Sequence, residues 1–288
     1  MTVVLAGVAA DGINTDPIPD RRPDGRFEYV PIPEPVTDTT ESLTYGTARL
    51  RHAESSLADV INWIRPGRHD DRVSTPDAIS AHPLHHDPNF AALTYGESGS
   101  RPDYIGKLRR LESGDVLGFY AGLRAGERVH RYLIGCFTVA EVVTVTPSTS
   151  TADRAATFAD HPENAHAKRY FGSPSAVHDT VAMVRGRPPG GLLARADLRL
   201  STFTAWEGNA RRAYYLDDAF VERFPLADPT FEHDPRSDHK DDKVYLGVKP
   251  ALVLDMSGEA FLQELGGPDV FDETVDRRFG KVPGAGSP

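Results

Sequence analysis

Cysteine and long apolar runs are what this sequence most lacks. Its 288 residues include a single cysteine, Cys136, so no disulfide can form within the chain. No apolar run approaches the roughly 20 residues that a membrane-spanning helix needs. The apolar start at 1–7 lacks a preceding basic segment, which favours a first β-strand over a signal peptide. We therefore expect a cytoplasmic protein without a membrane segment.

The motifs of several familiar protein classes are also missing. Neither Gly106-Lys107 nor Gly280-Lys281 is followed by the Ser or Thr of a phosphate loop. No G-x-G-x-x-G follows a predicted strand, and no G-x-S-x-G is present. The carboxylates of Asp11–Asp16 lack the alternating spacing of a calcium loop, so turn formation is the simpler interpretation. Cys136 lies in an apolar stretch, where a buried thiol is inert.

Lysine is scarce, and the net charge is negative. The chain has 6 Lys beside 26 Arg, 27 Asp beside 15 Glu, and a formal net charge of −10. This composition favours a protein adapted to concentrated salt, although a GC-rich genome would also favour Arg over Lys. The acidic balance argues against non-specific duplex binding through a basic face. It leaves room for a local pocket lined by arginines.

The clearest structural pattern lies between residues 101 and 146. Apolar residues follow helical spacing over 104–111, and a Gly-Asp turn precedes two apolar stretches at 116–120 and 131–139. A polar connection that contains glycine joins these stretches. This arrangement predicts a helix followed by an antiparallel pair of strands.

Further elements are indicated on both sides of this region. Apolar runs predict strands at 2–8 and 181–184, and Pro188–Gly191 predicts a turn after the second of them. Ser257 is placed to cap a helix that Gly266 ends. The segment 66–100 contains four prolines and is predicted to be mainly irregular, and long segments of that kind are usually functional or disordered.

Histidines cluster once and are otherwise scattered. The cluster lies within six residues and contains His82, His85, His86 and Asp87. Neutral imidazoles beside a carboxylate can bind zinc, but they can also contribute one or two residues to a pocket, or form a solvated loop. Because no Cys or His pair stands at zinc-finger spacing, we expect no metal site, and no cofactor is indicated. Scattered histidines such as His166 are expected at the surface or at helix ends.

Aromatic residues on the predicted strand pair have two interpretations. Phe119 and Tyr120 end the first strand, and Tyr132 lies on the second. Aromatic faces can stack on nucleic-acid bases, with roughly 1–3 kcal/mol for each base. Aromatic residues on strands also commonly fill a core, so both interpretations stay open.

Four short motifs, in this order and spacing, resemble a known family. They are Asp24-Gly25-Arg26, Val30-Pro31-Ile32-Pro33-Glu34, His86-Asp87-Pro88 and Gly114-Asp115-Val116-Leu117-Gly118-Phe119-Tyr120. Over residues 3–205 the chain is similar to the nucleotide modification associated domain proteins, in particular to their third numbered group. The resemblance implies a role in pathways that alter DNA bases, in prokaryotes and their viruses. It carries no assigned catalytic residue.

Residues 104–146 separately resemble PUA-like barrels of the EVE and ASCH kind. The likeness lies in the helix, the Gly-Asp turn, the strand that ends in Phe-Tyr, and a following strand of the form Ile-Gly-x-x-x-Val at 134–139. It implies an α+β fold with a PUA-like mixed or antiparallel β-barrel core centred on 101–205, an N-terminal elaboration and peripheral helices. Such barrels often hold a flipped or modified base. We expect a single domain over 1–278 and a flexible tail at 279–288.

Three functions remain open. The first is recognition of a modified base or nucleotide in a PUA-like pocket, with the binding candidates Arg26, His86, Asp87, Phe119, Tyr120 and Tyr132. The second is an enzyme of DNA base modification, with the acid–base candidates Asp11, Asp16, Asp24 and His86. The third is a protein-interaction subunit of a modification or defence complex, whose partners the sequence does not name and whose 66–100 segment would become ordered on binding.

Overall fold

The computed structural model describes most of the chain. The described residues are 2–36, 38–67, 69–99, 101–204, 213–227, 244–246 and 249–274. The predicted tail at 279–288 lies outside them. None of the helices within these ranges has the length and the apolar character that crossing a membrane requires.

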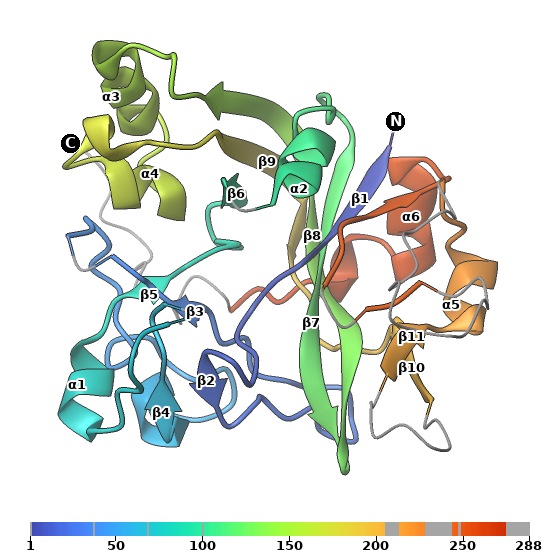
Figure 1. The fold of residues 1–288 in the computed structure, drawn as a ribbon. Coiled ribbons are helices and arrows are strands. Elements are labelled where there is room, and N and C mark those ends of the chain that lie inside the picture. Colours follow the sequence, from blue (N-terminus) through green and yellow to red (C-terminus); the bar gives the residue numbers. More distant parts are fainter. Residues whose placement is uncertain are drawn as a thin grey trace, which may run out of the picture.

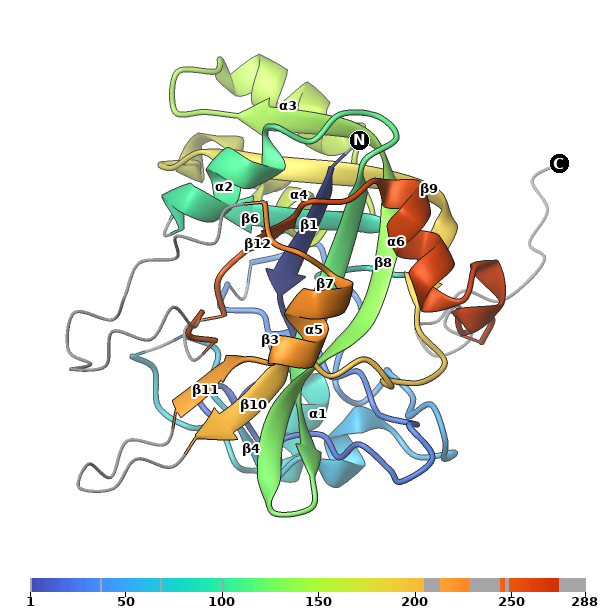
Figure 2. The same cartoon turned by 90° about the vertical axis from the view of Figure 1, so that its right-hand side faces the viewer.

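A six-stranded mixed sheet forms the centre of the molecule (Figure 1). Its strand order is β12-β1-β7-β8-β9-β6, with β1 parallel to β7 and every other neighbouring pair antiparallel. The strands are β1 (Val3–Gly7), β6 (Thr94–Ser98), β7 (Val116–Ala125), β8 (Arg128–Val145), β9 (Val181–Leu192) and β12 (Leu252–Leu254). The sheet curls into half of a barrel, which Figure 2 shows from the side. Together with its few helices it confirms the predicted α+β class.

Side chains on both faces of this sheet are buried. Along β1, Val4 and Ala6 enter one apolar core, whereas Val3 and Leu5 enter another. Alternate residues of a strand point to opposite faces, so each core contacts one face of the sheet. Coverage on both sides explains why the sequence of β1 is apolar throughout.

The predicted antiparallel pair is confirmed as the hairpin of β7 and β8. A two-residue connection, Gly126-Glu127, joins the strands, and Gly126 has a φ of 63°, which glycine adopts at little cost. The turn predicted at Pro188–Gly191 is wrong, because β9 continues through these residues. Phe137 of β8 pairs with Gly190, while the next residue of β8, Thr138, pairs with Arg187. The two prolines between these partners are therefore accommodated as a bulge in β9.

Short helices cover the edges and faces of the sheet. The α-helices are α1 (Pro76–Ala81), α2 (Pro102–Leu108), α3 (Thr151–Ala159), α4 (Ala165–Tyr170), α5 (Asp218–Arg223) and α6 (Gly258–Leu265), with 3₁₀ helices at Leu57–Val60, Pro174–Ala176 and Pro268–Val270. The predicted ends of α6 are confirmed. Ser257 Oγ accepts a hydrogen bond from Ala260 N at 3.1 Å, and Gly266 ends the helix with a left-handed φ of 105°.

An N-terminal layer with its own apolar core lies beside the large sheet (Figure 1). It contains two small antiparallel pairs, β2 (Thr15–Asp16) with β4 (Trp63–Ile64) and β3 (Ile32–Pro33) with β5 (Leu84–His85). A third small pair, β10 (Ser201–Thr204) with β11 (Ala213–Leu216), lies on the other side of the sheet near α5 (Figure 2).

The segment 66–100, which was predicted to be mainly irregular, supplies regular elements to both layers. It contains α1, β5 and β6 within its described residues. Pro76 opens α1 at the first helical turn, where the missing backbone N–H is not needed. Its Ile79 and Leu84 are buried in the core of the N-terminal layer, so apolar packing anchors the segment. The chain thus passes from this layer into the large sheet through β5 and β6.

Candidate functional site

A cavity of about 620 Å³ lies between the large sheet and the N-terminal layer. Its volume falls within the range of small-molecule sites, about 300–1,000 Å³. β6 is at one edge of the sheet and β1 is near the other, yet both line the cavity, because the sheet curls. The walls are Gly7, Val8, Ala9, Asp11, Ile13, Asn14, Ile32, Pro35, Arg65, Pro66, Gly67, His85, Asp87, Tyr95, Gly96, Glu97, Ser98, Arg101, His166, Arg169 and Lys249.

Charged side chains of both signs line this cavity. The carboxylates belong to Asp11, Asp87 and Glu97, and the cationic groups to Arg65, Arg101, Arg169 and Lys249. Buried charged groups are rare in proteins unless they are paired or bind something. The cavity therefore has a strongly charged lining, in which Asp87 is buried and Asp11 and Arg101 are partly exposed.

Glu34 holds one wall of the cavity together. Its Oε2 accepts a hydrogen bond from His85 Nδ1 at 2.7 Å, and its Oε1 accepts one from Arg169 Nε at 2.7 Å. Burial alone would raise the pKa of Glu34, but the contacts with His85 and Arg169 outweigh it and lower this pKa to about 2. The carboxylate is therefore ionised at neutral pH.

The ionised Glu34 fixes the tautomer of His85. An ionised carboxylate only accepts hydrogen bonds, so the proton of the His85 ring lies on Nδ1. Arg169 Nη2 is 3.1 Å from the same nitrogen but cannot donate to it, and the shorter contact with Glu34 decides the assignment. Burial and the charge of Arg169 lower the pKa of His85, so the ring is neutral and its Nε2 carries a lone pair.

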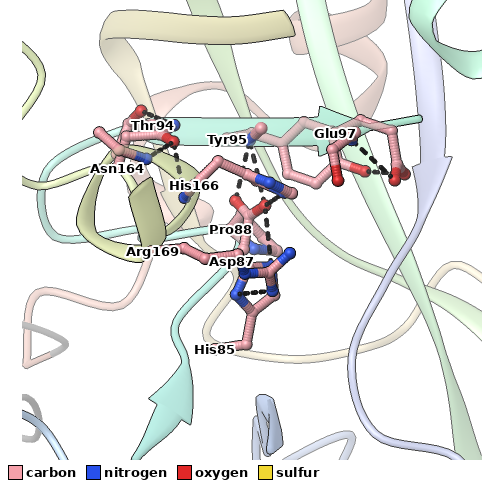
Figure 3. A network of polar contacts seen from close by, with 12 residues as sticks. His85, Asp87, Pro88, Thr94, Tyr95, Glu97, Asn164, His166 and Arg169 are labelled. Carbon is pink, nitrogen blue, oxygen red and sulfur yellow. Dashed lines mark hydrogen bonds and ion pairs between the residues drawn. The ribbon is translucent and has the colours of Figure 1, made fainter. Parts of the chain in front are cut away.

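Asp87 lies at the centre of the polar cluster that Figure 3 shows. Its two carboxylate oxygens accept the N–H of Gly96 at 3.0 and 3.1 Å. Its Oδ2 lies 3.7 Å from His85 Nε2 and 3.5 Å from His166 Nε2. Burial, reinforced by the charges of Glu97 and Glu34, raises the pKa of Asp87 well above its ordinary value, although the Gly96 N–H opposes this effect.

Helix α4 brings His166 and Arg169 to the cavity. Asn164 caps the helix by accepting hydrogen bonds from His166 N and Ala167 N, and its Nδ2 donates to Thr94 Oγ1 on β6 at 2.9 Å. His166 is buried, and within the described residues its Nδ1 has no hydrogen-bond partner. Burial, with the charge of Arg169, lowers the pKa of His166 well below its ordinary value, so this imidazole is also neutral.

Two further ion pairs form another part of the cavity wall. Lys249 Nζ lies 3.0 Å from Asp11 Oδ2, and Arg101 Nη1 lies 3.3 Å from Glu97 Oε2. Tyr95 donates its hydroxyl proton to the same Glu97 oxygen at 3.3 Å. Burial raises the pKa of Glu97 even though Arg101 opposes the shift. This wall therefore combines a cationic edge with a second carboxyl group of raised pKa.

The acid–base candidates predicted from the sequence do not share one cleft. Asp11 lines the cavity, whereas Asp16 lies in β2, where its Oδ2 accepts from Asn62 Nδ2 at 2.8 Å. Asp24 is half-exposed and pairs with Arg26. His86 is buried, with its ring 6.4 Å from that of Tyr29.

The predicted binding candidates are similarly divided. Asp87 lines the cavity, but Arg26 is half-exposed in its pair with Asp24. Phe119 packs against other aromatic rings in the apolar core, and Tyr120 donates its hydroxyl proton to Pro250 O at 2.6 Å. Tyr132 is buried below the guanidinium group of Arg21. None of these three aromatic residues is among those that line the cavity in the described part of the chain.

Sequence reasoning missed Glu34, Glu97, His166, Arg169 and Lys249 as members of the site. One signal was available for two of them, because residues three apart share a helix face and His166 and Arg169 have this spacing. His166 was expected at the surface or at a helix end. It does lie in the first turn of α4, but its side chain is buried.

Comparisons with known proteins give one match. No curated protein and no solved structure matches the chain. The family model described as nucleotide modification associated domain 3 matches residues 2–246, a range that includes every cavity-lining residue except Lys249. Because this match covers most of the 288 residues, the chain belongs to the nucleotide modification associated domain 3 family.

Proposed function

We propose that the cavity binds a nucleotide, with a modified base as the part that distinguishes it. The observation that carries the proposal is the charge pattern of one cavity of about 620 Å³. Its cationic groups suit a phosphate, and its carboxyl groups suit the polar edge of a base. Membership of the nucleotide modification associated family supports a role of this kind.

Arg65 is the strongest candidate for the phosphate contact. Within the described residues it pairs with no carboxylate, and its Nε is buried without a hydrogen-bond partner. Arg101, Arg169 and Lys249, in contrast, each have a carboxylate partner. A guanidinium group binds phosphate through two parallel hydrogen bonds, which would satisfy the nitrogen atoms of Arg65.

Asp87 and Glu97 are our candidates for reading the base. A carboxyl group with a raised pKa can keep its proton, and it then both donates and accepts hydrogen bonds. Such a group matches a base edge that presents a donor beside an acceptor. In this proposal the base is recognised through polar contacts, because Phe119 and Tyr120 are buried in the core and cannot stack on it.

We further propose that residues 101–205 correspond to a PUA-like core. The order of helix α2, the Gly114-Asp115 turn and strand β7 supports this, as does the curl of the sheet. Arg101, His166 and Arg169 of this core line the cavity described above, together with residues of the segments that precede it. A base held there would therefore contact both parts of the chain.

A thermal-shift panel tests the binding proposal. The protein is mixed with plain and modified nucleosides and with their 5′-monophosphates at millimolar concentration. We expect the monophosphates to raise the Tm more than the nucleosides do, because only they carry the phosphate that Arg65 would bind. A ligand at 100 times its Kd adds about 2.7 kcal/mol of stability. Arg65→Gln should remove most of that difference, whereas Arg110→Gln, at an exposed site on the turn after α2, should leave it unchanged. A panel without any Tm shift would rule out the proposal.

An enzymatic role in base modification is a second candidate. It is favoured because Asp87 and Glu97, whose pKa values are raised, line the same cavity as the neutral imidazole of His166. Such groups are suited to proton transfer. Mass spectrometry of plain and modified deoxynucleotides after incubation should then show a time-dependent change. Glu97→Gln should abolish the change, and Asp77→Asn, at an exposed site on α1, should not. Unchanged masses throughout the panel would remove this candidate.

A further inference from the structure

Three buried side chains from two separate parts of the chain converge in the wall of the cavity. His85 comes from β5, Asp87 from the segment just after it, and His166 from the first turn of α4. Each offers one ligand atom, and these atoms all lie within 4.8 Å of one another. Figure 3 shows the three side chains directed toward one another.

The spacing of these atoms differs from that of a hydrogen-bonded cluster. Asp87 Oδ2 is 3.5 Å from His166 Nε2 and 3.7 Å from His85 Nε2, which is too long for a good hydrogen bond. A tetrahedral ion with bonds of about 2.0–2.1 Å holds its ligand atoms about 3.4 Å apart. These two separations are therefore close to those of ligands around one ion, and the third is within 4.8 Å.

The surroundings resemble the outer shell of a metal site. Histidine ligands of metals usually donate their second ring N–H to a carboxylate or a carbonyl group, which fixes the ring orientation. His85 does so through Nδ1 to Glu34 Oε2 at 2.7 Å, and Arg169 in turn holds Glu34. Gly96 N donates to Asp87, so this ligand is also oriented by a hydrogen bond.

We propose that His85, Asp87 and His166 bind one divalent transition-metal ion, with zinc and ferrous iron as the best matches. Two imidazoles and one carboxylate form a set that both ions use in sites with open positions. Calcium and magnesium prefer six or more oxygen ligands, and this cluster supplies a single carboxylate. All three residues line the cavity, so the remaining coordination positions of a bound ion would face its open space. Metal binding requires the ionised form of Asp87, so an occupied site leaves Glu97 as the carboxyl group that reads the base. The inference goes beyond nucleotide binding and does not depend on it.

Cobalt(II) is the probe for this site, because it takes zinc positions and absorbs visible light. The purified full chain is stripped with a chelator and titrated with Co²⁺, then with Zn²⁺, while metal content is counted by mass spectrometry. We expect one equivalent per chain, an absorption band typical of nitrogen and oxygen ligands, and displacement of Co²⁺ by Zn²⁺. Magnesium in excess should not compete.

Ligand variants locate the ion. Asp87→Asn and His166→Gln should weaken Co²⁺ binding more than about 100-fold, since even an outer-shell substitution costs about 10–100-fold. Glu34→Gln should fall in that smaller range. The control is His161→Gln, because His161 is also buried and has a carboxylate partner, Glu141 at 3.1 Å, but lies outside the cluster. Circular dichroism confirms that each variant is folded.

Two results would overturn the proposal. One is folded wild-type protein that binds less than a stoichiometric amount of Co²⁺, and the other is equal binding by wild type and Asp87→Asn. The second comparison remains available if His166→Gln does not fold, since the amide introduced by Asp87→Asn keeps an oxygen to accept the Gly96 N–H. If the protein binds Co²⁺ but no nucleotide, only the proposed function is contradicted. If it binds nucleotides but no Co²⁺, only this inference is contradicted.

Discussion

Gly96 shares its surroundings with two side chains of the site. A Cβ built on this residue would lie 2.5 Å from His166 Cδ2 and 3.1 Å from Asn164 Oδ1. We expect Gly96→Ala to lower the free energy of unfolding by about 1–3 kcal/mol, because the imidazole must move within a packed region. Urea denaturation followed by fluorescence measures the change.

Gly106 supplies the matched control for that substitution. It lies inside α2, and nothing lies within 4 Å of the position of an added Cβ. Gly106→Ala should therefore stabilise the protein by up to about 1 kcal/mol through helix propensity alone. If the two substitutions change the free energy of unfolding equally, the crowding at Gly96 does not affect stability.

Asp11 gives the fold a defined response to acid. Burial opposes its ionisation, but the charge of Lys249 and the N–H of Ile13 outweigh burial and lower the pKa of Asp11. A carboxylate with a lowered folded-state pKa stabilises the fold above its unfolded-state pKa, and this contribution is lost as the pH falls through the folded-state pKa.

The wild type should therefore exceed Asp11→Asn in stability at pH 7, by about 1 kcal/mol or less because the pair is partly exposed. The difference should shrink below about pH 4, where the carboxylate becomes protonated. Urea titrations between pH 2.5 and 7 check this trend. A difference that grows toward acid pH would contradict the assignment of the Asp11–Lys249 pair.

At the scale of elements, Asn164 connects helix α4 to the large sheet. It caps α4 and also donates to Thr94 Oγ1 on β6, so Asn164→Ala removes both contacts. We expect a loss of about 2–3 kcal/mol in the free energy of unfolding, made up of the cap and the buried hydrogen bond.

Ser150→Ala is the comparison, because Ser150 caps α3 at an exposed position. Its loss should be about 1 kcal/mol, the usual contribution of a cap alone. Both values come from urea unfolding under the same conditions. If the two variants lose the same stability, the contact between Asn164 and β6 contributes nothing measurable.

Local signals predicted the elements whose ends are decided within a few residues. Ser257 and Gly266 mark the two ends of α6, and Gly126 lies in the short connection between β7 and β8. The turn predicted at Pro188–Gly191 failed because pairing with β8 on both sides of Pro188 and Pro189 carries β9 through these residues. That pairing depends on residues more than 40 positions away, which local propensity does not report.

The site could be predicted from the sequence only in part, for the same reason. Alternation along the extended segment explains why His85 and Asp87 face the cavity while His86 faces the aromatic core. His166 joins them from α4 only because α4 packs beside β6. No local pattern could reveal this contact, so the sequence did not indicate that His166 lies beside His85 and Asp87.

At the scale of the whole molecule, the net charge of −10 predicts a response to salt. Mutual repulsion of acidic groups destabilises the compact state, and ions screen it. The screening length falls from about 30 Å at 0.01 M salt to about 8 Å at 0.15 M.

We therefore expect the Tm to rise by a few degrees over this range of sodium chloride, where 1 kcal/mol corresponds to about 2–4 °C for a chain of this size. Sucrose at matched osmolality is the uncharged control. A Tm that falls as salt is added would show that attractive ion pairs dominate the surface instead.

The segment from Lys249 to Leu254 lies beyond the part of the chain that the family model matches. Lys249 forms a piece of the cavity wall, and its carbonyl oxygen accepts hydrogen bonds from Arg101 and Tyr104. Shortly afterwards β12 pairs with β1. A protein shortened to the matched region would have a breached cavity and an unprotected edge on β1, a strand that is apolar throughout and prone to join its like in other molecules. In this protein the residues beyond the matched region thus both complete the wall of the cavity and cover the β1 edge of the sheet.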